Sequence, residues 1–180
     1  MTSRERVSAA LNHTEPDRTP VFEYVLLPPI ADILLGRKAV SVHARWQEAA
    51  GEMGWEAAVR QTARDLVDLA MVLQHDMLFA PLPPGPAPPA TVSDEPVDDP
   101  VERLRARNRR AAEAPEMPES RFLLYLCLKE EMVRRGLDLP VMASAAGHGI
   151  WTDTDLMEAM LLDPDVAREH FALATKRCLS

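Results

Sequence analysis

The stretch SRERVSAALNHTEPDRTPVFEY, residues 3–24, decides how the chain begins to fold. Thr2 and Glu5 have the spacing of a capping box, and the apolar residues after them recur at helical spacing, which predicts a helix ending near His13. The prolines of TEPDRTP cannot continue this helix, because proline lacks a backbone donor and forces the preceding residue toward extended geometry. The run VFEYVLL, residues 21–27, then predicts a buried β-strand.

Helical patterns dominate the rest of the chain. Prolines fit the first turn of PPIADILLG and Gly36 fits its end, while Gly136 ends the pattern of SRFLLYLCLKEEMVRRG. Asp98 or Asp99 lies near the N-cap of a basic helix, and the pair Asp163-Pro164 divides the last pattern into two helices. The expected helical segments are 28–36, 43–53, 59–74, 99–114, 120–136, 154–162 and 164–180.

Two further apolar runs, MLFAPL at 77–82 and LPVMASAAG at 139–147, predict strands. Strands separated by amphipathic helices, with connections too long for hairpins, indicate parallel βα units. Residues 81–100 hold eight prolines in twenty positions, which predicts an extended surface loop or an internal linker. After the last helix no strand remains to pair the open sheet edge, so we expect a truncated α/β fold.

The composition limits the classes of partner. A net charge of -8 repels phosphate backbones, and no stretch interleaves aromatic with basic residues, so a nucleic-acid partner is not expected. No run approaches the roughly 18 apolar residues of a membrane span, and the charged start is no export signal. We therefore expect a cytoplasmic protein with no membrane partner. Cys127 and Cys178 lack the spacing of a zinc site, and His170 lies two turns from Cys178, so no metal site is expected in this chain.

The stretch RERVSAALNHTEPDRTPVFEY resembles the N-terminus of the uroporphyrinogen decarboxylase superfamily, and the later segments come in a similar order. The resemblance implies an α/β fold, a partial (β/α)8 TIM barrel comprising the N-terminal half with an N-terminal helix. Residues 1–180 would form one truncated uroporphyrinogen decarboxylase-like domain that includes the loop 81–100. A complete barrel of this kind usually needs about 250 residues.

The resemblance implies one of two activities, porphyrinogen decarboxylation (a lyase) or corrinoid-linked methyl transfer. Decarboxylases of the family carry arginines after the first strand, where this chain has Val25 and Pro29, and its second strand ends in FAPLPP without an acid. A substrate with many carboxylates needs fixed positive charge, so the methyltransferase-like branch is favoured. Intact relatives of that branch bind zinc through residues of the absent barrel half, so we expect no cofactor here.

The implied partners are a small-molecule substrate or a corrinoid protein. Because half the barrel is missing, this chain alone could be inactive, and whether it is an enzyme is left open. The alternative is a non-catalytic truncated remnant, or a half-barrel interaction module that needs a second chain, for example in a homodimer.

Chemistry in barrels gathers at the C-terminal ends of strands, which makes Glu23, Tyr24, His148 and Trp151 the candidate pocket residues. No catalytic role is assigned to any of them. His148 lies between two glycines that allow close approach to a ligand, or else it is a solvated turn residue. Glu23 is a general base if it points into a pocket, and otherwise needs Arg18 or Arg37 as a partner.

His75 and Asp76 precede the second strand at its N-terminal end. A stabilising role there competes with a catalytic one. Asp17 and Arg18 are expected to fix the turn that leads into the first strand.

Overall fold

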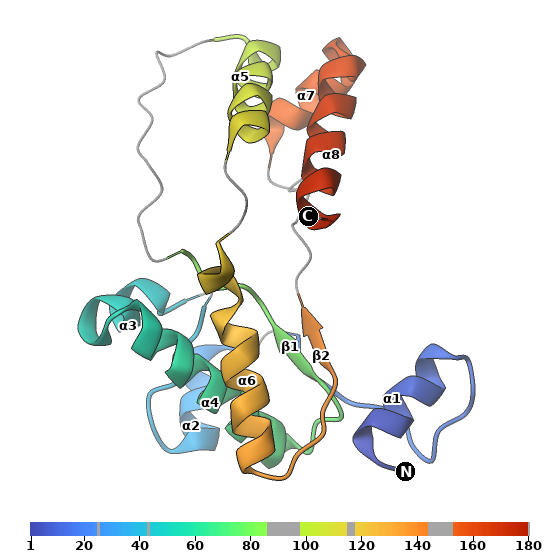
Figure 1. Ribbon diagram of the computed structural model, residues 1–180, viewed down its shortest axis with the longest axis vertical. Coiled ribbons are helices and arrows are strands. Elements are labelled where there is room, and N and C mark those ends of the chain that lie inside the picture. Colours follow the sequence, from blue (N-terminus) through green and yellow to red (C-terminus); the bar gives the residue numbers. More distant parts are fainter. Residues whose placement is uncertain (25, 43, 86–97, 115–117, 144–152, 180) are drawn as a thin grey trace. The chain divides into compact units, whose positions relative to one another are not determined.

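A computed structural model describes residues 1–24, 26–42, 44–85, 98–114, 118–143 and 153–179 (Figure 1). The chain divides into two compact units. The larger unit comprises Met1–Pro88 and Glu119–Ser144, and the smaller comprises Pro89–Pro118 and Ala145–Ser180.

The chain begins with helix α1 (Ser3–Leu11), whose capping box is formed as the spacing predicts. The Thr2 hydroxyl accepts a hydrogen bond from the Glu5 backbone, and the Glu5 carboxylate accepts one from the Thr2 backbone. Helix α2 (Pro28–Leu35) begins on two prolines and ends at Gly36, which adopts a left-handed φ of 64°. The N-terminal cap of α1 and both ends of α2 agree with the sequence prediction.

Helices α3 (Trp46–Met53) and α4 (Trp55–Leu73) are joined by Gly54, whose φ of 85° favours glycine. Helix α4 buries a wide face, because its apolar residues recur every three to four positions. It packs beside α6 (Leu123–Arg134), which comes directly after the short 3-10 helix η1 (Glu119–Phe122).

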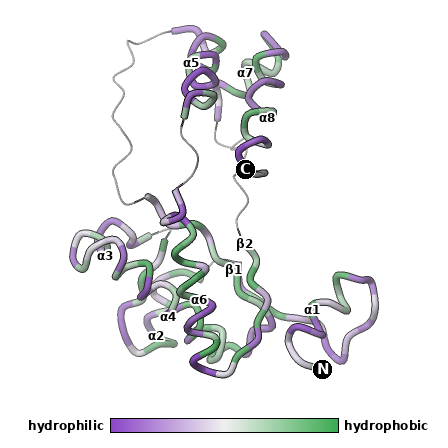
Figure 2. Tube along the Cα trace, viewed as in Figure 1, coloured by the Kyte–Doolittle hydropathy of each residue, from purple (hydrophilic) through white to green (hydrophobic). Residues whose placement is uncertain are grey.

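Strands β1 (Leu78–Ala80) and β2 (Val141–Ala143) pair in parallel, with Leu78 opposite Val141. The parallel direction confirms the βα pattern. Figure 2 shows hydrophobic residues along both strands. The main core of the larger unit joins β1 to α4 and α6. Its buried members are Trp46, Ala49, Ala58, Val59, Ala63, Val67, Ala70, Leu78, Ala80, Leu124, Cys127, Leu128 and Leu139.

The smaller unit contains α5 (Pro100–Glu113), α7 (Thr154–Leu162) and α8 (Pro164–Leu179), which pack on one another. Asp99 is the N-cap of α5, and its side chain accepts a hydrogen bond from the Val101 backbone. The core of this unit consists of Val101, Leu104, Leu156, Ala159, Val166 and Ala167.

The expected fold class was wrong. The described residues are mostly helical (64%) and form a sheet of only two short strands, β1 and β2, so they contain no partial (β/α)8 barrel. Parallel strands do alternate with helices, but three-residue strands supply too few backbone hydrogen bonds to begin the wall of a barrel.

The expected strand at 21–27 is also not formed among its described residues, 21–24 and 26–27. Val21 uses both of its backbone groups on Asp76: its N–H donates to the carboxylate and its carbonyl accepts from the Asp76 backbone at 2.7 Å. Val21, Phe22 and Tyr24 are 47%, 38% and 61% exposed, so they do not provide the burial that stabilises a central strand.

Within the described part of the chain, no helix is both long enough and apolar enough to cross a membrane.

Candidate functional site

A pocket opens in the larger unit between residues 23, 24 and 26, Ala31 of α2, the loop 39–42, one face of α4, and residues 75–81. The pocket is partly open to solvent. Most of the lining is apolar. The residues that bring polar or aromatic groups to it include Glu23, Tyr24, Thr62, Asp65, His75 and Phe79.

Glu23 and Tyr24, two of the four predicted pocket residues, line this pocket. The Tyr24 ring stacks on Phe79 of β1, with 4.2 Å between ring centroids and 26° between planes. The other two candidates, His148 and Trp151, lie outside the described residues. The structure thus brings together the half of the predicted site that it describes.

Neither suggested arginine partner of Glu23 binds it. Arg37 pairs with Asp65 and, at 2.8 Å, with Asp68, while Arg18 pairs with Asp76. The Glu23 carboxylate makes no hydrogen bond or ion pair with any described residue, and it faces the pocket instead of a cation.

Asp65 is buried on α4. The sequence did not predict it as a pocket residue, because it is one of several acids in a helical pattern. Its carboxylate accepts hydrogen bonds from the Val40 backbone and from the Gln61 amide, each at 2.7 Å, in addition to the Arg37 ion pair. Thr62, also buried, donates to the Ala58 carbonyl. Both polar groups are satisfied within the protein, and the Asp65 contacts with Arg37 and Val40 hold the loop after α2 against α4.

His75 is half-buried and also lines the pocket. Burial lowers the pKa of His75 below its usual value, and the negative charges of Glu23 and Asp76 offset this only in part. The imidazole is therefore neutral at neutral pH, and it can donate one hydrogen bond and accept another. From the sequence, the position of His75 before β1 favours a stabilising role over a catalytic one. In the structure Tyr24 packs against Phe79 of β1, and His75 lines the same pocket.

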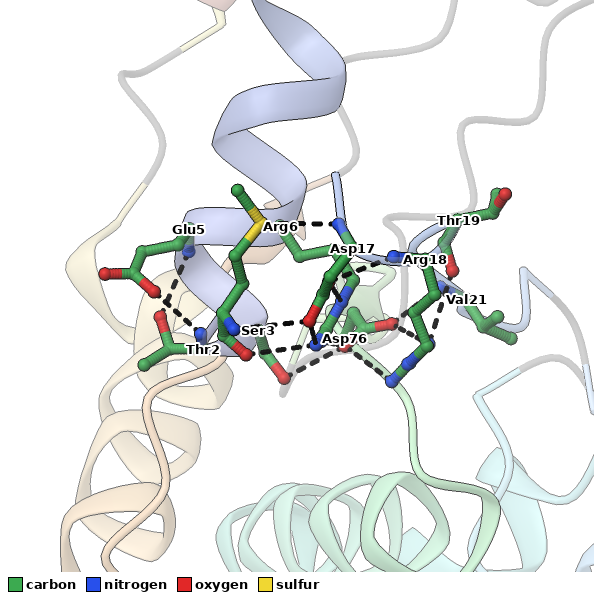
Figure 3. Close-up of polar contacts among 10 residues, drawn as sticks. Thr2, Ser3, Glu5, Arg6, Asp17, Arg18, Thr19, Val21 and Asp76 are labelled. Atoms are coloured by element: carbon green, nitrogen blue, oxygen red, sulfur yellow. Dashed lines mark hydrogen bonds and ion pairs between the residues drawn. The ribbon is translucent and has the colours of Figure 1, made fainter. Parts of the chain in front are cut away.

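Asp76 belongs to a separate cluster with Arg6, Asp17 and Arg18, which we call the N-terminal clamp (Figure 3). The Asp76 side chain is 0% exposed, and its carboxylate accepts from Arg6 at 2.5 Å and from Arg18 at 2.6 Å. Arg6 also binds Asp17 at 2.6 Å, and Ser3 donates to Asp76 at 3.1 Å. The clamp ties α1 and the turn after it to the start of β1, which is the stabilising role rather than the catalytic one.

Hydrogen bonding governs the ionisation of the clamp. Burial acts to raise the pKa of Asp76, but the hydrogen bonds from Val21, Arg6 and Ser3 and the charge of Arg18 outweigh it and lower the pKa. The Arg6 hydrogen bonds hold the pKa of Asp17 far below its usual range. Both carboxylates are charged at neutral pH, so the clamp is fully paired there.

The described residues offer no site for zinc. They contain no group of three or more His, Cys, Asp and Glu side chains that could share a metal ion. Cys127 is free and buried in the main core, and burial raises the pKa of its thiol, so it is protonated at neutral pH.

Comparison with family models, with curated proteins and with solved structures found no match for this chain.

Proposed function

We propose that the chain is a uroporphyrinogen decarboxylase-like protein that binds a small molecule in the pocket of its larger unit and serves in corrinoid-linked methyl transfer. The observation that carries this proposal is the pocket itself, which is mostly apolar and is lined in part by Glu23 and Tyr24. These residues complete the opening stretch that resembles the family.

The charge of the pocket favours methyl transfer over porphyrinogen decarboxylation. A substrate with eight carboxylates requires several fixed cations. No lysine or arginine is among the described residues that line the pocket, and the nearby Arg37 is already paired with Asp65 and Asp68. Glu23 would repel such a substrate.

The zinc of the methyltransferase-like relatives does not fit the described residues, so no step through zinc is derived. This chain contributes an apolar surface and polar groups that orient a bound molecule. A corrinoid protein or free methylcobalamin would supply the methyl group, and a thiolate would accept it. In that transfer the sulfur–carbon bond forms, the cobalt–carbon bond breaks, and its electron pair stays on cobalt.

The test uses the full chain, methylcobalamin and a thiol. We expect the chain to accelerate loss of the methylcobalamin absorbance, and Ser41→Trp, which fills the pocket, to abolish the acceleration while the fold is retained by circular dichroism. Release of CO2 from uroporphyrinogen would instead assign the decarboxylase branch. No turnover of either substrate would refute the proposed activity.

A second candidate, an interaction module that binds a second copy of the chain, is favoured by exposed apolar side chains on α2. Three large apolar side chains are exposed there: Leu27 at the N-cap of the helix, and Ile30 and Ile33 within it. Large apolar groups gathered on one helix commonly mark an interface. Sedimentation should then give at least twice the monomer mass, and Ile33→Glu should return the protein to a monomer; a monomeric wild type would exclude this candidate.

A further inference from the structure

The pocket combines an apolar lining with one carboxylate that nothing neutralises. Glu23 has no ion-pair or hydrogen-bond partner in the described part of the chain, whereas Asp65, the other acid of the lining, has three. Glu23 is exposed to water, and a ligand that brings the opposite charge to the pocket would form an ion pair with it.

The cations that could neutralise Glu23 are held elsewhere. Arg18 donates to both oxygens of Asp76, at 2.6 and 2.9 Å, and Arg37 bridges Asp65 and Asp68 on α4. Lys38 pairs with Glu48. His75 is neutral at neutral pH and supplies no charge. Among the described residues, no lysine or arginine therefore competes with a cationic ligand for Glu23.

An aromatic pair also lines the pocket. Tyr24 comes directly after Glu23 in the chain, and its ring stacks on Phe79 with 4.2 Å between centroids. Much of the Tyr24 ring is exposed, so one of its faces is available to a ligand. Aromatic faces attract ammonium groups, and a carboxylate next to such a face strengthens the attraction.

The rest of the lining suits a hydrocarbon group. Leu26, Ala31, Leu66, Leu69 and Leu78 all contribute to it, and Ala31 and Leu78 are buried. A ligand that is apolar along its body and cationic at one end would match both parts of the pocket.

We propose that this pocket binds a small organic cation, an ammonium group that carries an apolar substituent, with the ammonium held between Glu23 and the Tyr24–Phe79 pair. This inference rests on the proposed function, because it names the class of molecule that the same pocket takes.

Benzylamine, which is an ammonium ion at neutral pH, is the probe, with benzyl alcohol and benzoate as matched neutral and anionic compounds. We expect calorimetric titration to show benzylamine binding about tenfold more tightly than benzyl alcohol, and benzoate binding more weakly than either. Equal affinity for benzylamine and benzyl alcohol would overturn the inference, as would stronger binding of benzoate.

Glu23→Gln removes the charge from an exposed side chain and should leave the fold intact. The variant is expected to lose the tenfold preference for benzylamine while it retains its affinity for benzyl alcohol. Glu15→Gln, a matched change at an exposed acid that does not line the pocket, should keep the preference. A Glu23→Gln variant that still prefers benzylamine tenfold would refute the role of Glu23.

The two proposals fail separately. Loss of methylcobalamin turnover in Ser41→Trp, without any preference for the cation, would leave the activity standing and reject the ligand class. A Glu23-dependent preference for benzylamine in a chain that turns over no methylcobalamin would do the reverse.

Discussion

At the scale of single residues, Asp76 is the most constrained side chain of the larger unit. It accepts from Arg6, Arg18, Ser3 and the Val21 backbone, and no part of it reaches water. A buried charge with this many partners is strongly destabilising when one side of the pairing is removed, because the other side is left buried without compensation.

We therefore predict that Asp76→Asn lowers the free energy of unfolding by about 3–5 kcal/mol, the range for a broken buried ion pair. Asp138→Asn is the matched control, since Asp138 pairs with Arg4 in an exposed site. It should cost much less, because water screens exposed pairs. Urea denaturation measures both, and equal losses in the two variants would contradict the burial argument.

The acid dependence of stability should depend on the same carboxylate. Hydrogen bonds and Arg18 lower the pKa of folded Asp76 below its usual 3.8, so its stabilisation is complete above that pH and disappears as the pH falls through the folded value. We expect the wild type to lose stability on acidification more steeply than Asp76→Asn, as measured by urea midpoints from pH 6 downward. Parallel curves would show that Asp76 does not titrate with unfolding.

At the scale of elements, the sequence predicts helices well and strands poorly. The N-caps of α1 and α5 and the glycine end of α2 depend on residues within one turn, so they can be predicted from the local sequence. The segment 21–24 is apolar enough for a strand, yet its backbone binds Asp76, more than fifty residues away. The local sequence therefore cannot predict that Val21 bonds Asp76 instead of a neighbouring strand.

Gly36 and Gly51 allow the effect of backbone conformation on stability to be tested without a change in packing. A methyl group added at Gly36 or at Gly51 would meet no atom within 4 Å, but Gly36 has a left-handed φ of 64° and Gly51 lies inside α3. Gly36→Ala should destabilise the protein by about 1 kcal/mol, because other residues resist that conformation. Gly51→Ala should stabilise it by roughly 0.5–1 kcal/mol, because alanine loses less freedom in a helix.

Thermal denaturation of the two variants in parallel is the measurement. Changes of the same sign would mean that the end of α2 does not require the left-handed conformation.

At the scale of the whole molecule, the two units have separate cores. Leu128 is completely buried in the core of the larger unit and Leu156 is completely buried in that of the smaller, and the two cores share no residue. Units with their own cores can unfold separately.

We predict that Leu128→Ala and Leu156→Ala each cost about 2–5 kcal/mol, but in different units. Hydrogen exchange should show Leu128→Ala weakening protection in α4 and α6, and Leu156→Ala weakening it in α5 and α8. If each substitution weakened protection equally in both units, the chain would be a single cooperative structure.

The candidate site also has residues that the sequence predicts and residues that it does not. Glu23 and Tyr24 were predicted as pocket residues from the rule that barrel chemistry gathers at the ends of strands, and they line a pocket although the described residues form neither the strand at 21–27 nor a barrel. Asp65 and His75 could not be predicted, since their place in the pocket depends on how α4 and β1 pack against distant segments.

By itself the sequence determined the helices, their caps, their glycine ends and the parallel direction of the two strands, because these depend on neighbours within a few residues and on the lengths of the connections. Only the tertiary structure decided how short the strands are, that no barrel forms, that Arg18 and Arg37 bind Asp76 and Asp65 rather than Glu23, and that a pocket opens beside Tyr24. Each of these outcomes is a competition between partners far apart in the chain, and packing rather than local preference decides which pair wins.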